Sequence, residues 1–164
     1  MRYLIEQEMT LMIQQRFHIY DETGRSVYYV DSEWRTSTLY LHVYDMNGNA
    51  VLTVKRKTTF ITPACDLLVE GKKIATIEKE VTFMKPQFLV KDLNWSVVGD
   101  MSFHNYAIAK NGDVIGDVSK KMFNFKDTYV IDVYDDKETL YMLGIVIGID
   151  CMLFKGKKTT RMMF

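Results

Sequence analysis

The sequence lacks several features that mark common classes of protein. In 164 residues it has only two prolines, nine glycines and no low-complexity tract, which argues against long linkers and extensive disorder. Its 21 basic residues equal its 21 acidic residues. This balance argues against general nucleic-acid binding, because such binding needs a basic surplus to displace counterions. A neutral total still allows a local basic patch.

Cysteine and long apolar runs are scarce too. Cys65 and Cys151 are far apart and have neither metal-ligand nor redox spacing, so we interpret them as reduced, mostly buried thiols. Reduced thiols predict a cytoplasmic protein. Glu6 and Glu8 interrupt the apolar residues near the N-terminus, and no signal peptide is expected. The one long apolar run, residues 140–149, has about half the length that a membrane-spanning helix needs, so no transmembrane segment is predicted.

Motifs for catalysis and metal binding are missing as well. His18, His42 and His104 lie far from one another, and we expect each to face solvent or to hydrogen-bond in a structural role. No serine has the glycine-flanked elbow of acyl-transfer enzymes. Gly112 and Gly116 are not followed by the Gly-Lys-Ser/Thr of a phosphate-binding loop. The sequence therefore assigns no catalytic, cofactor-binding or metal-ligating residue.

What the sequence does contain is a repeated unit. Four glycines each follow a polar or turn-forming residue, and an aliphatic residue comes three and again six positions after each glycine. A glycine in a hairpin turn that needs positive φ, followed by a strand, explains this pattern. In three of the four units a basic residue follows at eight positions. The glycines are Gly24, Gly48, Gly71 and Gly112, and the basic residues are Arg56, Lys79 and Lys120.

The spacing of the aliphatic residues leaves two interpretations open. Residues three apart point to opposite faces of a regular strand, so either a β-bulge restores the phase or both faces are covered. Segments such as 38–44 and 129–134 alternate in the way of half-buried strands. Residues 1–134 have room for about twelve short strands. A meander of that length is expected to close, because an open sheet leaves two unpaired edges.

After Tyr134 the pattern predicts one helix, from Asp136 to about Asp150. Asp135 and Glu138 give it a cap-like start with favourable charge for the helix dipole. The run that follows is apolar on every side, and such a helix must be enclosed on every side.

Two glycines four positions apart, Gly144 and Gly148, leave a smooth stripe on this helix, where backbone can approach closely. The β-branched residues of 145–149 keep a strand open as the alternative. Since the rest of the chain offers only strands, we expect a mostly-β fold: a closed antiparallel barrel of about twelve strands around a central hydrophobic C-terminal helix. Residues 1–164 are expected to form a single domain.

Several segments, in this order along almost the whole chain, carry a family resemblance. They are residues 1–4, 24–30, 80–88, 98–100, 118–123, 127–129 and the apolar helix that ends at Asp150. Together they resemble the bacterial LURP-one-related family, within the tubby C-terminal-like and phospholipid scramblase superfamily. The resemblance implies a closed barrel of about twelve strands threaded by a hydrophobic C-terminal helix.

The resemblance implies little about activity. Eukaryotic relatives include phosphoinositide-binding tubby domains and membrane-associated scramblases, but a shared fold is weak support for a shared function. Scramblases are associated with calcium and with lipid attachment. This sequence has no acidic run at calcium-loop spacing and no cysteine cluster for acylation, so those features are not carried over.

Basic clusters are the one surface feature that points to a function. One interpretation is edge protection and solubility. The other is contact with an anionic lipid headgroup or another anion, to which each basic side chain near the surface contributes about 1 kcal/mol. Their matching position in the repeats would place the first two clusters at one end of the barrel. The residues are Lys55, Arg56, Lys57, Lys120, Lys121, Lys155, Lys157, Lys158 and Arg161.

These observations lead to three functional hypotheses. The first is a non-catalytic binding or scaffolding domain that contacts anionic lipid headgroups or another anionic ligand. Such a domain would be cytoplasmic and peripheral at the membrane. The second is a structural domain that acts through an unknown protein partner. The third is an enzyme of unknown type, which an open polar pocket with converging carboxylates or histidines would support.

Overall fold

The computed structural model describes residues 1–6, 16–57, 63–80, 87–100, 105–123 and 126–162, and of residues 122–123, 126–127 and 153–162 it describes the backbone alone. Within these ranges the chain forms twelve strands, then a short 3-10 helix and an α-helix. The strands are β1 (Arg2–Glu6), β2 (Phe17–Asp21), β3 (Ser26–Arg35), β4 (Thr38–Asp45), β5 (Ala50–Lys57), β6 (Ala64–Val69), β7 (Lys72–Glu80), β8 (Gln87–Lys91), β9 (Trp95–Asp100), β10 (Asn105–Lys110), β11 (Asp113–Phe123) and β12 (Lys126–Val133).

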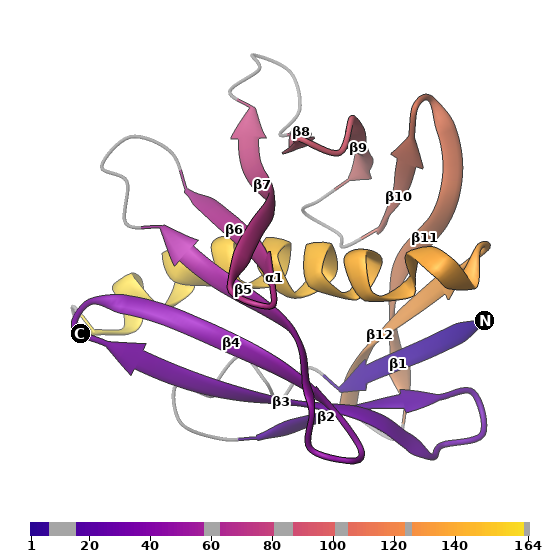
Figure 1. Cartoon of the computed structure of the whole chain (residues 1–164), viewed down its shortest axis with the longest axis horizontal. Helices are drawn as coiled ribbons and strands as arrows, with labels where there is room; N and C mark the ends of the chain where they lie inside the picture. Colours follow the sequence, from indigo (N-terminus) through magenta and orange to yellow (C-terminus); the bar gives the residue numbers. More distant parts are fainter. Residues whose placement is uncertain (7–15, 58–62, 81–86, 101–104, 124–125, 163–164) are drawn as a thin grey trace.

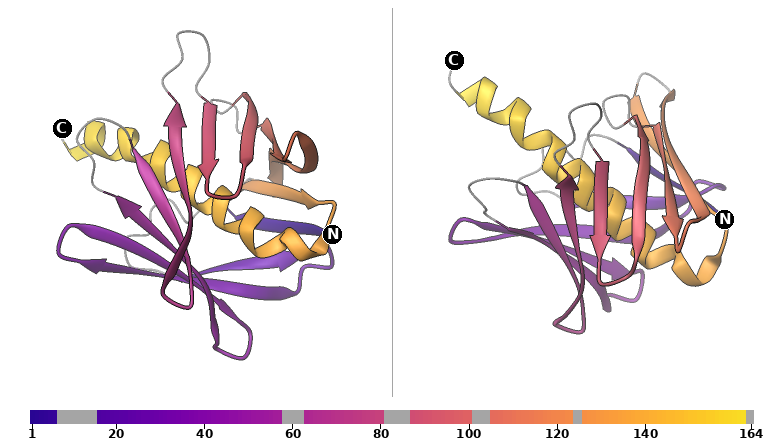
Figure 2. Two further views of the ribbon diagram at one scale, coloured as in Figure 1. Left: turned by 45° about the horizontal axis from the view of Figure 1, so that its top comes forward. Right: turned by 90° about the horizontal axis from the view of Figure 1, so that it is seen from above.

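The strands form one closed antiparallel barrel. Each strand pairs with the next along the chain, and β1 pairs with β12, with Arg2 opposite Asp132 and Glu6 opposite Thr128. The wall surrounds α1, which runs lengthwise through the barrel (Figures 1 and 2). The predicted barrel of about twelve strands around a C-terminal helix is confirmed. Closure leaves none of the twelve described strands with an unpaired edge, as expected for a meander of this length.

A β-bulge settles the phase of the repeated unit. In each of the four hairpins that hold the repeat glycines, the register of the ladder shifts close to the turn. In β11, for example, Val114 pairs with Ala109 and Gly116 with Ile108, so Ile115 is skipped. Ile115 packs against the core and Val118 is fully buried. The bulge thus directs both aliphatic positions to the interior.

The turns themselves use positive φ where the sequence supplies residues that tolerate it. Asn111 and Gly112 have φ of 51° and 90°, as the two central residues of a type I′ turn require. In the hairpin of Gly48, φ is 87° at the glycine, whose backbone N–H donates to the carbonyl of Asp45 at 3.0 Å. Both geometries follow the twist of the flanking strands, which is why the hairpins form locally.

The helix begins where the sequence predicts and continues further. Asp135 caps the 3-10 helix η3 (Asp136–Glu138) by accepting from the backbone N–H of Lys137, and α1 (Thr139–Met162) follows directly. Every residue from Met142 to Asp150 is buried, so the enclosure is confirmed. The predicted end near residue 150 was wrong, because α1 runs on to Met162 and leaves the barrel (Figure 1). Asp150 interrupts the apolar run, but residues 151–154 are apolar again and no proline follows to end the helix.

Two glycines let α1 lie close against β5, β6 and β7. A Cβ atom built on Gly144 would lie 2.6 Å from a methyl group of Leu52, and one built on Gly148 would lie 2.8 Å from a methyl group of Ile77. Distances this short do not occur between real side chains. The smooth stripe is therefore needed for packing, and the alternative of a strand at residues 145–149 was wrong.

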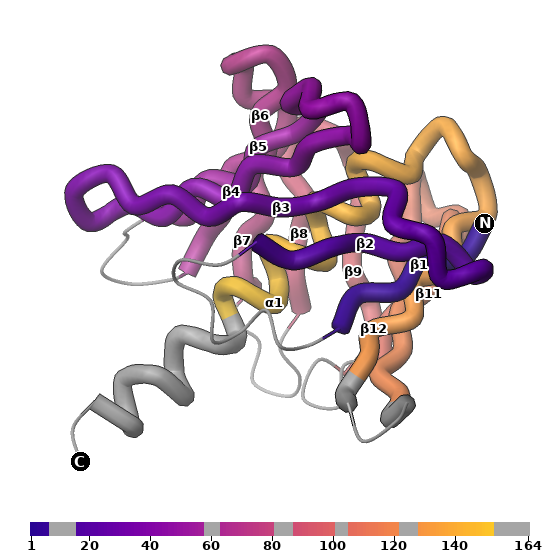
Figure 3. Tube along the Cα trace, turned by 90° about the horizontal axis from the view of Figure 1, so that it is seen from below, coloured from indigo at the N-terminus to yellow at the C-terminus, as the bar shows by residue number. Residues whose placement is uncertain are grey.

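The barrel has two different ends. At the turn end lie the hairpins of residues 22–25, 46–49, 70–71 and 111–112 and the helix η3. At the exit end, β5 stops at Lys57, β7 stops at Glu80 and α1 leaves the barrel (Figures 1 and 3).

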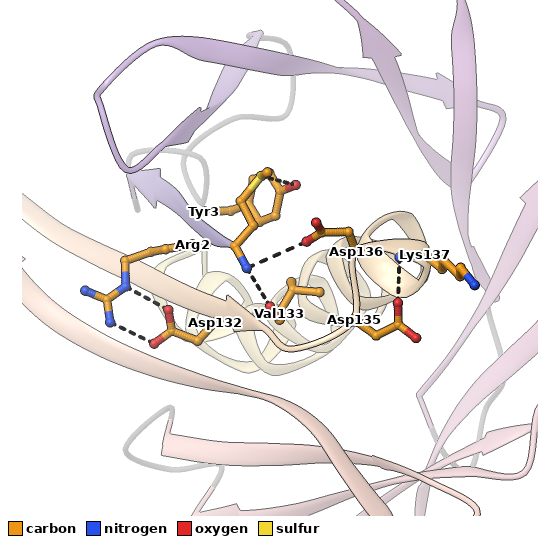
Figure 4. A network of polar contacts seen from close by, with 8 residues as sticks. Arg2, Tyr3, Asp132, Val133, Asp135, Asp136 and Lys137 are labelled. Carbon is orange, nitrogen blue, oxygen red and sulfur yellow. Dashed lines mark hydrogen bonds and ion pairs between the residues drawn. The ribbon is translucent and has the colours of Figure 1, made fainter.

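The turn end is fixed by polar contacts between the first and last strands and η3 (Figure 4). The guanidinium of Arg2 donates to both carboxylate oxygens of Asp132, at 2.7 and 2.9 Å. This bidentate pair joins β1 to β12 where the barrel closes.

Candidate functional site at the exit end

The strand pairing directs three basic residues into the barrel at its exit end. Arg56 on β5 pairs with Cys65, and Lys79 on β7 pairs with Phe88. Lys120 on β11 pairs with Tyr129. Directly paired residues lie on the same face of a sheet. The three partners are buried in the core, so the three basic residues face the interior. These are the residues eight positions after the repeat glycines.

Each of these basic side chains is only partly buried, because it lies near the open end of its strand. Arg56 and Lys79 are the last interior-facing residues of β5 and β7 within those elements. In the strand order of the barrel, β5 and β7 are separated by β6 alone, and β11 lies four strands beyond β7, so the three residues occupy two parts of the wall at the exit end. Positive charge is thereby directed at the rim of the barrel.

Asp150 is the acidic residue of α1 near the exit end. It is 8% exposed and accepts a hydrogen bond from the hydroxyl of Tyr129. The pKa of Tyr106 is raised, mainly by burial and to a smaller extent by the charge of Asp150. The described residues that face the interior at the exit end therefore include three cations and one carboxylate.

The sequence clusters divide across the barrel wall. Lys55 and Lys57 flank Arg56 and point outward, where Lys57 pairs with Asp66 at 3.2 Å and Lys55 lies over the ring of Tyr40. Lys121 is exposed on the outer face, next to interior-facing Lys120. The cluster of residues 55–57 therefore does not present one surface.

The remaining basic residues belong to the part of α1 beyond the enclosed segment. There the backbone is helical to Met162, and the side chains lie outside the described part of the structure. These residues are Lys155, Lys157, Lys158 and Arg161.

The repeat carries a signal for the interior cations that runs of charge do not show. Lys79 belongs to the repeat but to none of the predicted basic clusters. Once the bulge is known, positions four, six and eight after each glycine share the interior face. A basic residue at the eighth position is then an unusual interior residue, and the repeat alone could have singled it out.

The outer wall carries a separate row of aromatic and charged side chains on β2, β3 and β4. The rings of Tyr29 and Tyr44 stack at 5.1 Å, and those of Tyr40 and His42 at 6.0 Å. His42 contacts Glu33 at 2.8 Å. Hydrogen bonds to Arg35 and to His42 lower the pKa of Glu33 to about 2.

The histidine hypothesis fits where it can be checked. His42 also contacts the hydroxyl of Thr53 at 3.0 Å, and His18 contacts that of Ser26 at 2.8 Å. His104 lies outside the described residues. Among the residues that the structure does describe, no three histidine, cysteine or acidic side chains come together in a way that would hold a metal ion.

Helix α1 does not qualify as a membrane span. In the described part of the chain, no helix combines the length and the apolar character that crossing a bilayer requires.

Comparisons with known proteins agree on the fold and leave activity open. The model of the LURP-one-related family matches residues 1–150. The protein YxjI of Bacillus subtilis (strain 168), described as uncharacterized, is 26% identical over 141 residues, which cover 86% of this chain and 87% of YxjI. A crystal structure of a protein from Arabidopsis thaliana superposes with a TM-score of 0.60 at 13% identity, over 91% of this chain and 90% of the plant protein. At that identity, the likeness shows the fold alone.

Proposed function

Because the chain belongs to the LURP-one-related family, a membership that does not itself assign an activity, we propose from its site that it is a non-catalytic domain that binds anionic phospholipid headgroups at the exit end of the barrel. The observation that carries the proposal is the set of interior-facing cations, Arg56, Lys79 and Lys120. Phosphate and carboxylate groups of lipids are the anions that such a rim meets at a membrane surface.

Charge at this end supports an anionic ligand. Three cations and one carboxylate, Asp150, face the interior there, and the core residues next to them are apolar. Charges next to a low-dielectric wall interact more strongly than the same charges in water. A ligand that brings negative charge to the rim would be stabilised there, and a neutral one would not.

An exposed aromatic residue supports a lipid surface as the source of the anion. Trp34, which is 42% exposed, pairs with Leu39 on the interior-facing row at the exit end. Tryptophan favours the boundary between headgroups and acyl chains, because its ring is apolar and its N–H is polar. The basic C-terminal part of α1 leaves the barrel at the same end and would add further charge.

Three further proposals concern the domain organisation, the superfamily and the cellular location of the chain. We propose that residues 1–164 are one domain, that the family belongs with the tubby C-terminal-like and phospholipid scramblase superfamily, and that the protein is cytoplasmic and peripheral at the membrane. The barrel described here supports the superfamily assignment. Reduced thiols support the cytoplasm.

Co-sedimentation with liposomes tests the proposal. Vesicles of phosphatidylcholine with phosphatidylserine are expected to bind the protein in a salt-sensitive way, and vesicles of phosphatidylcholine alone are not. The variant with Arg56→Gln, Lys79→Gln and Lys120→Gln should lose affinity by about fivefold for each charge removed. Soluble glycerophosphoserine and inorganic phosphate, added as competitors, show whether a free anion occupies the same site.

A control with the same change of charge separates the site from general attraction. Lys72→Gln, Lys73→Gln and Lys137→Gln change three exposed residues at the turn end. Lys55→Gln with Lys57→Gln changes the outward-facing neighbours of Arg56. Both controls are expected to bind almost as the wild type does. Equal losses in the turn-end control and the exit-end variant, or equal binding to neutral and anionic vesicles, would overturn the proposal.

A second candidate function is binding of a protein partner to the outer wall. The observation in its favour is the row of stacked rings at Tyr29, Tyr44, Tyr40 and His42, since aromatic side chains are enriched at protein interfaces. Pull-down from native extract is expected to recover one stoichiometric protein with the wild type and none with Tyr29→Ser combined with Tyr44→Ser. Recovery of no such protein by the wild type would count against it.

A further inference from the structure

The fold brings the two cysteines together. Cys65 on β6 faces the interior and is fully buried, and its thiol contacts the carbonyl oxygen of Gly148 on α1 at 3.7 Å. Cys151 follows Gly148 by three residues and therefore lies on the same face of the helix. The two thiols are near enough to shift each other's pKa, that of Cys65 upward and that of Cys151 downward. The glycine stripe makes this approach close, because a Cβ on Gly148 would lie 3.5 Å from the Cβ of Cys65.

The surroundings of the two thiols differ. Cys65 is enclosed, whereas Cys151 is half-buried and lies near the exit end. The neighbouring Cys65 lowers the pKa of Cys151, and the guanidinium of Arg56 lowers it further against the opposing effect of burial. The neighbouring Cys151 and burial raise the pKa of Cys65. Cys151 is thus the thiol that carries negative charge more readily, and Cys65 is the one that keeps its proton.

Other charged groups act on the pair from both elements. Asp66 on β6 neighbours Cys65, and Asp150 on α1 neighbours Cys151, and each disfavours the thiolate. Arg56 opposes both, and its strand position beside Cys65 is fixed by the ladder. Cys151 therefore combines partial access, a cation and a second thiol within reach, which are the features of oxidation-sensitive cysteines.

We propose that Cys151 and Cys65 form a reactive dithiol, which hydrogen peroxide oxidises to an intramolecular disulfide that ties α1 to β6. The thiolate sulfur of Cys151 attacks one oxygen of the peroxide, the O–O bond breaks, and hydroxide leaves and takes up a proton as water. Cys151 is then a sulfenic acid. The sulfur of Cys65 attacks the sulfur of Cys151, the S–OH bond breaks, and a second water leaves with the proton of Cys65. Two thiols lose two electrons, and the peroxide gains them.

This disulfide would fix the helix to the wall just where α1 leaves the barrel. It would also join residues that are widely separated in the sequence, and such a bond constrains the unfolded chain. The midpoint of chemical denaturation is therefore expected to rise after oxidation and to return after reduction. Formation of this disulfide depends on the geometry of the two thiols and not on lipid binding.

Peroxide treatment of the native wild-type protein tests the inference. The reduced protein is exposed to equimolar hydrogen peroxide, unfolded in the presence of N-ethylmaleimide and weighed as an intact chain. We expect both thiols to be protected from alkylation and the mass of the chain to fall by about 2 Da, for the two hydrogens lost. Peptide mapping should find the peptides of Cys65 and Cys151 joined within one monomer, a result that needs no variant.

Two variants assign the roles. In Cys65→Ser the sulfenic acid has no thiol to resolve it, so dimedone is expected to label Cys151. In Cys151→Ser the same dose should leave Cys65 unlabelled. Arg56→Gln should slow disulfide formation severalfold, because the cation that favours the thiolate is lost. The inference is overturned if both thiols of the native protein remain alkylatable, if dimedone labels Cys65 in Cys151→Ser, or if only disulfides between chains form.

Discussion

The hydroxyl of Tyr129 on β12 donates a hydrogen bond to the carboxylate of Asp150 on α1, inside the barrel. Tyr129 is 1% exposed and Asp150 is 8% exposed, so water does not readily replace this bond. Asp150 is the first charged residue after the apolar run of residues 140–149. The barrel wall thus holds the acidic residue that ends the apolar run.

Removing this hydroxyl tests the contribution of the pair. Tyr129→Phe should lower the free energy of unfolding by about 1.5–3 kcal/mol, the range for a hydrogen bond to a charged group. Tyr134→Phe is the matched control, because Tyr134 also donates to a carboxylate, that of Asp117, but is 61% exposed. Its cost should stay below about 1 kcal/mol. Urea denaturation measures the loss of unfolding free energy in both variants. Equal losses would contradict the view that burial strengthens the hydrogen bond of Tyr129.

Much of the fold could be predicted from the sequence, because its signals are local. The alternation of residues such as 129–134 indicates strands whatever their neighbours are. The apolar run of 140–149 has no polar face to give to water, so its enclosure followed from composition alone. The end of α1 went wrong, since Asp150 interrupts an apolar run without ending a helix and no proline follows it.

The candidate site could not be predicted because it depends on register. Whether Arg56 faces inward or outward changes with a shift of one residue, and the bulge near Gly48 makes that shift. The approach of Cys65 to Cys151 depends on closure of the whole barrel and on the depth of α1 within it. No spacing along the chain records such a contact.

Gly116 on β11 is predicted to tolerate no side chain. A Cβ there would lie 2.3 Å from the carbonyl oxygen of Asp132, which is backbone and cannot rotate away. Gly116→Ala should therefore cost about 3 kcal/mol, at the upper end of the usual range for overpacking. Gly112→Ala is the control, because a Cβ at Gly112 meets open space and only the positive φ opposes it. Its cost should be about 1 kcal/mol. A midpoint of thermal unfolding that falls equally in both variants would disprove the steric argument.

Lys110 is predicted to support Glu138 where the chain enters the helix. Its ammonium donates to the carboxylate of Glu138, which is 8% exposed, and lies 5.9 Å from the centre of the Trp95 ring. Lys110→Met leaves a buried carboxylate without this cation and should cost about 2 kcal/mol. Adding Glu138→Gln to that variant removes the charge and should recover part of the loss. A double-mutant cycle in urea measures the coupling, and strictly additive costs would show that the two side chains act independently.

The contacts of Glu33 on the outer wall predict that the free energy of unfolding depends on pH in the acidic range. Arg35 donates to its carboxylate at 2.9 and 3.1 Å and His42 contacts it at 2.8 Å, and together they lower its pKa from 4.5 to about 2. A carboxylate with a lowered pKa stabilises the folded state above its unfolded value, and this stabilisation is lost as the pH falls toward the folded value. The difference in unfolding free energy between the wild type and Glu33→Gln should thus be constant above about pH 5 and shrink between about pH 4.5 and pH 2.

Exposed Glu22 in the first hairpin turn provides the control for loss of one negative charge. Denaturant titrations of Glu33→Gln and Glu22→Gln at a series of pH values separate the local effect from the change in net charge. Because the ion pair lies at the surface, added salt should weaken the difference for Glu33. If the stability difference for Glu33→Gln were the same at pH 2.5 as at pH 6, the contacts with Arg35 and His42 would not be the cause of the lowered pKa.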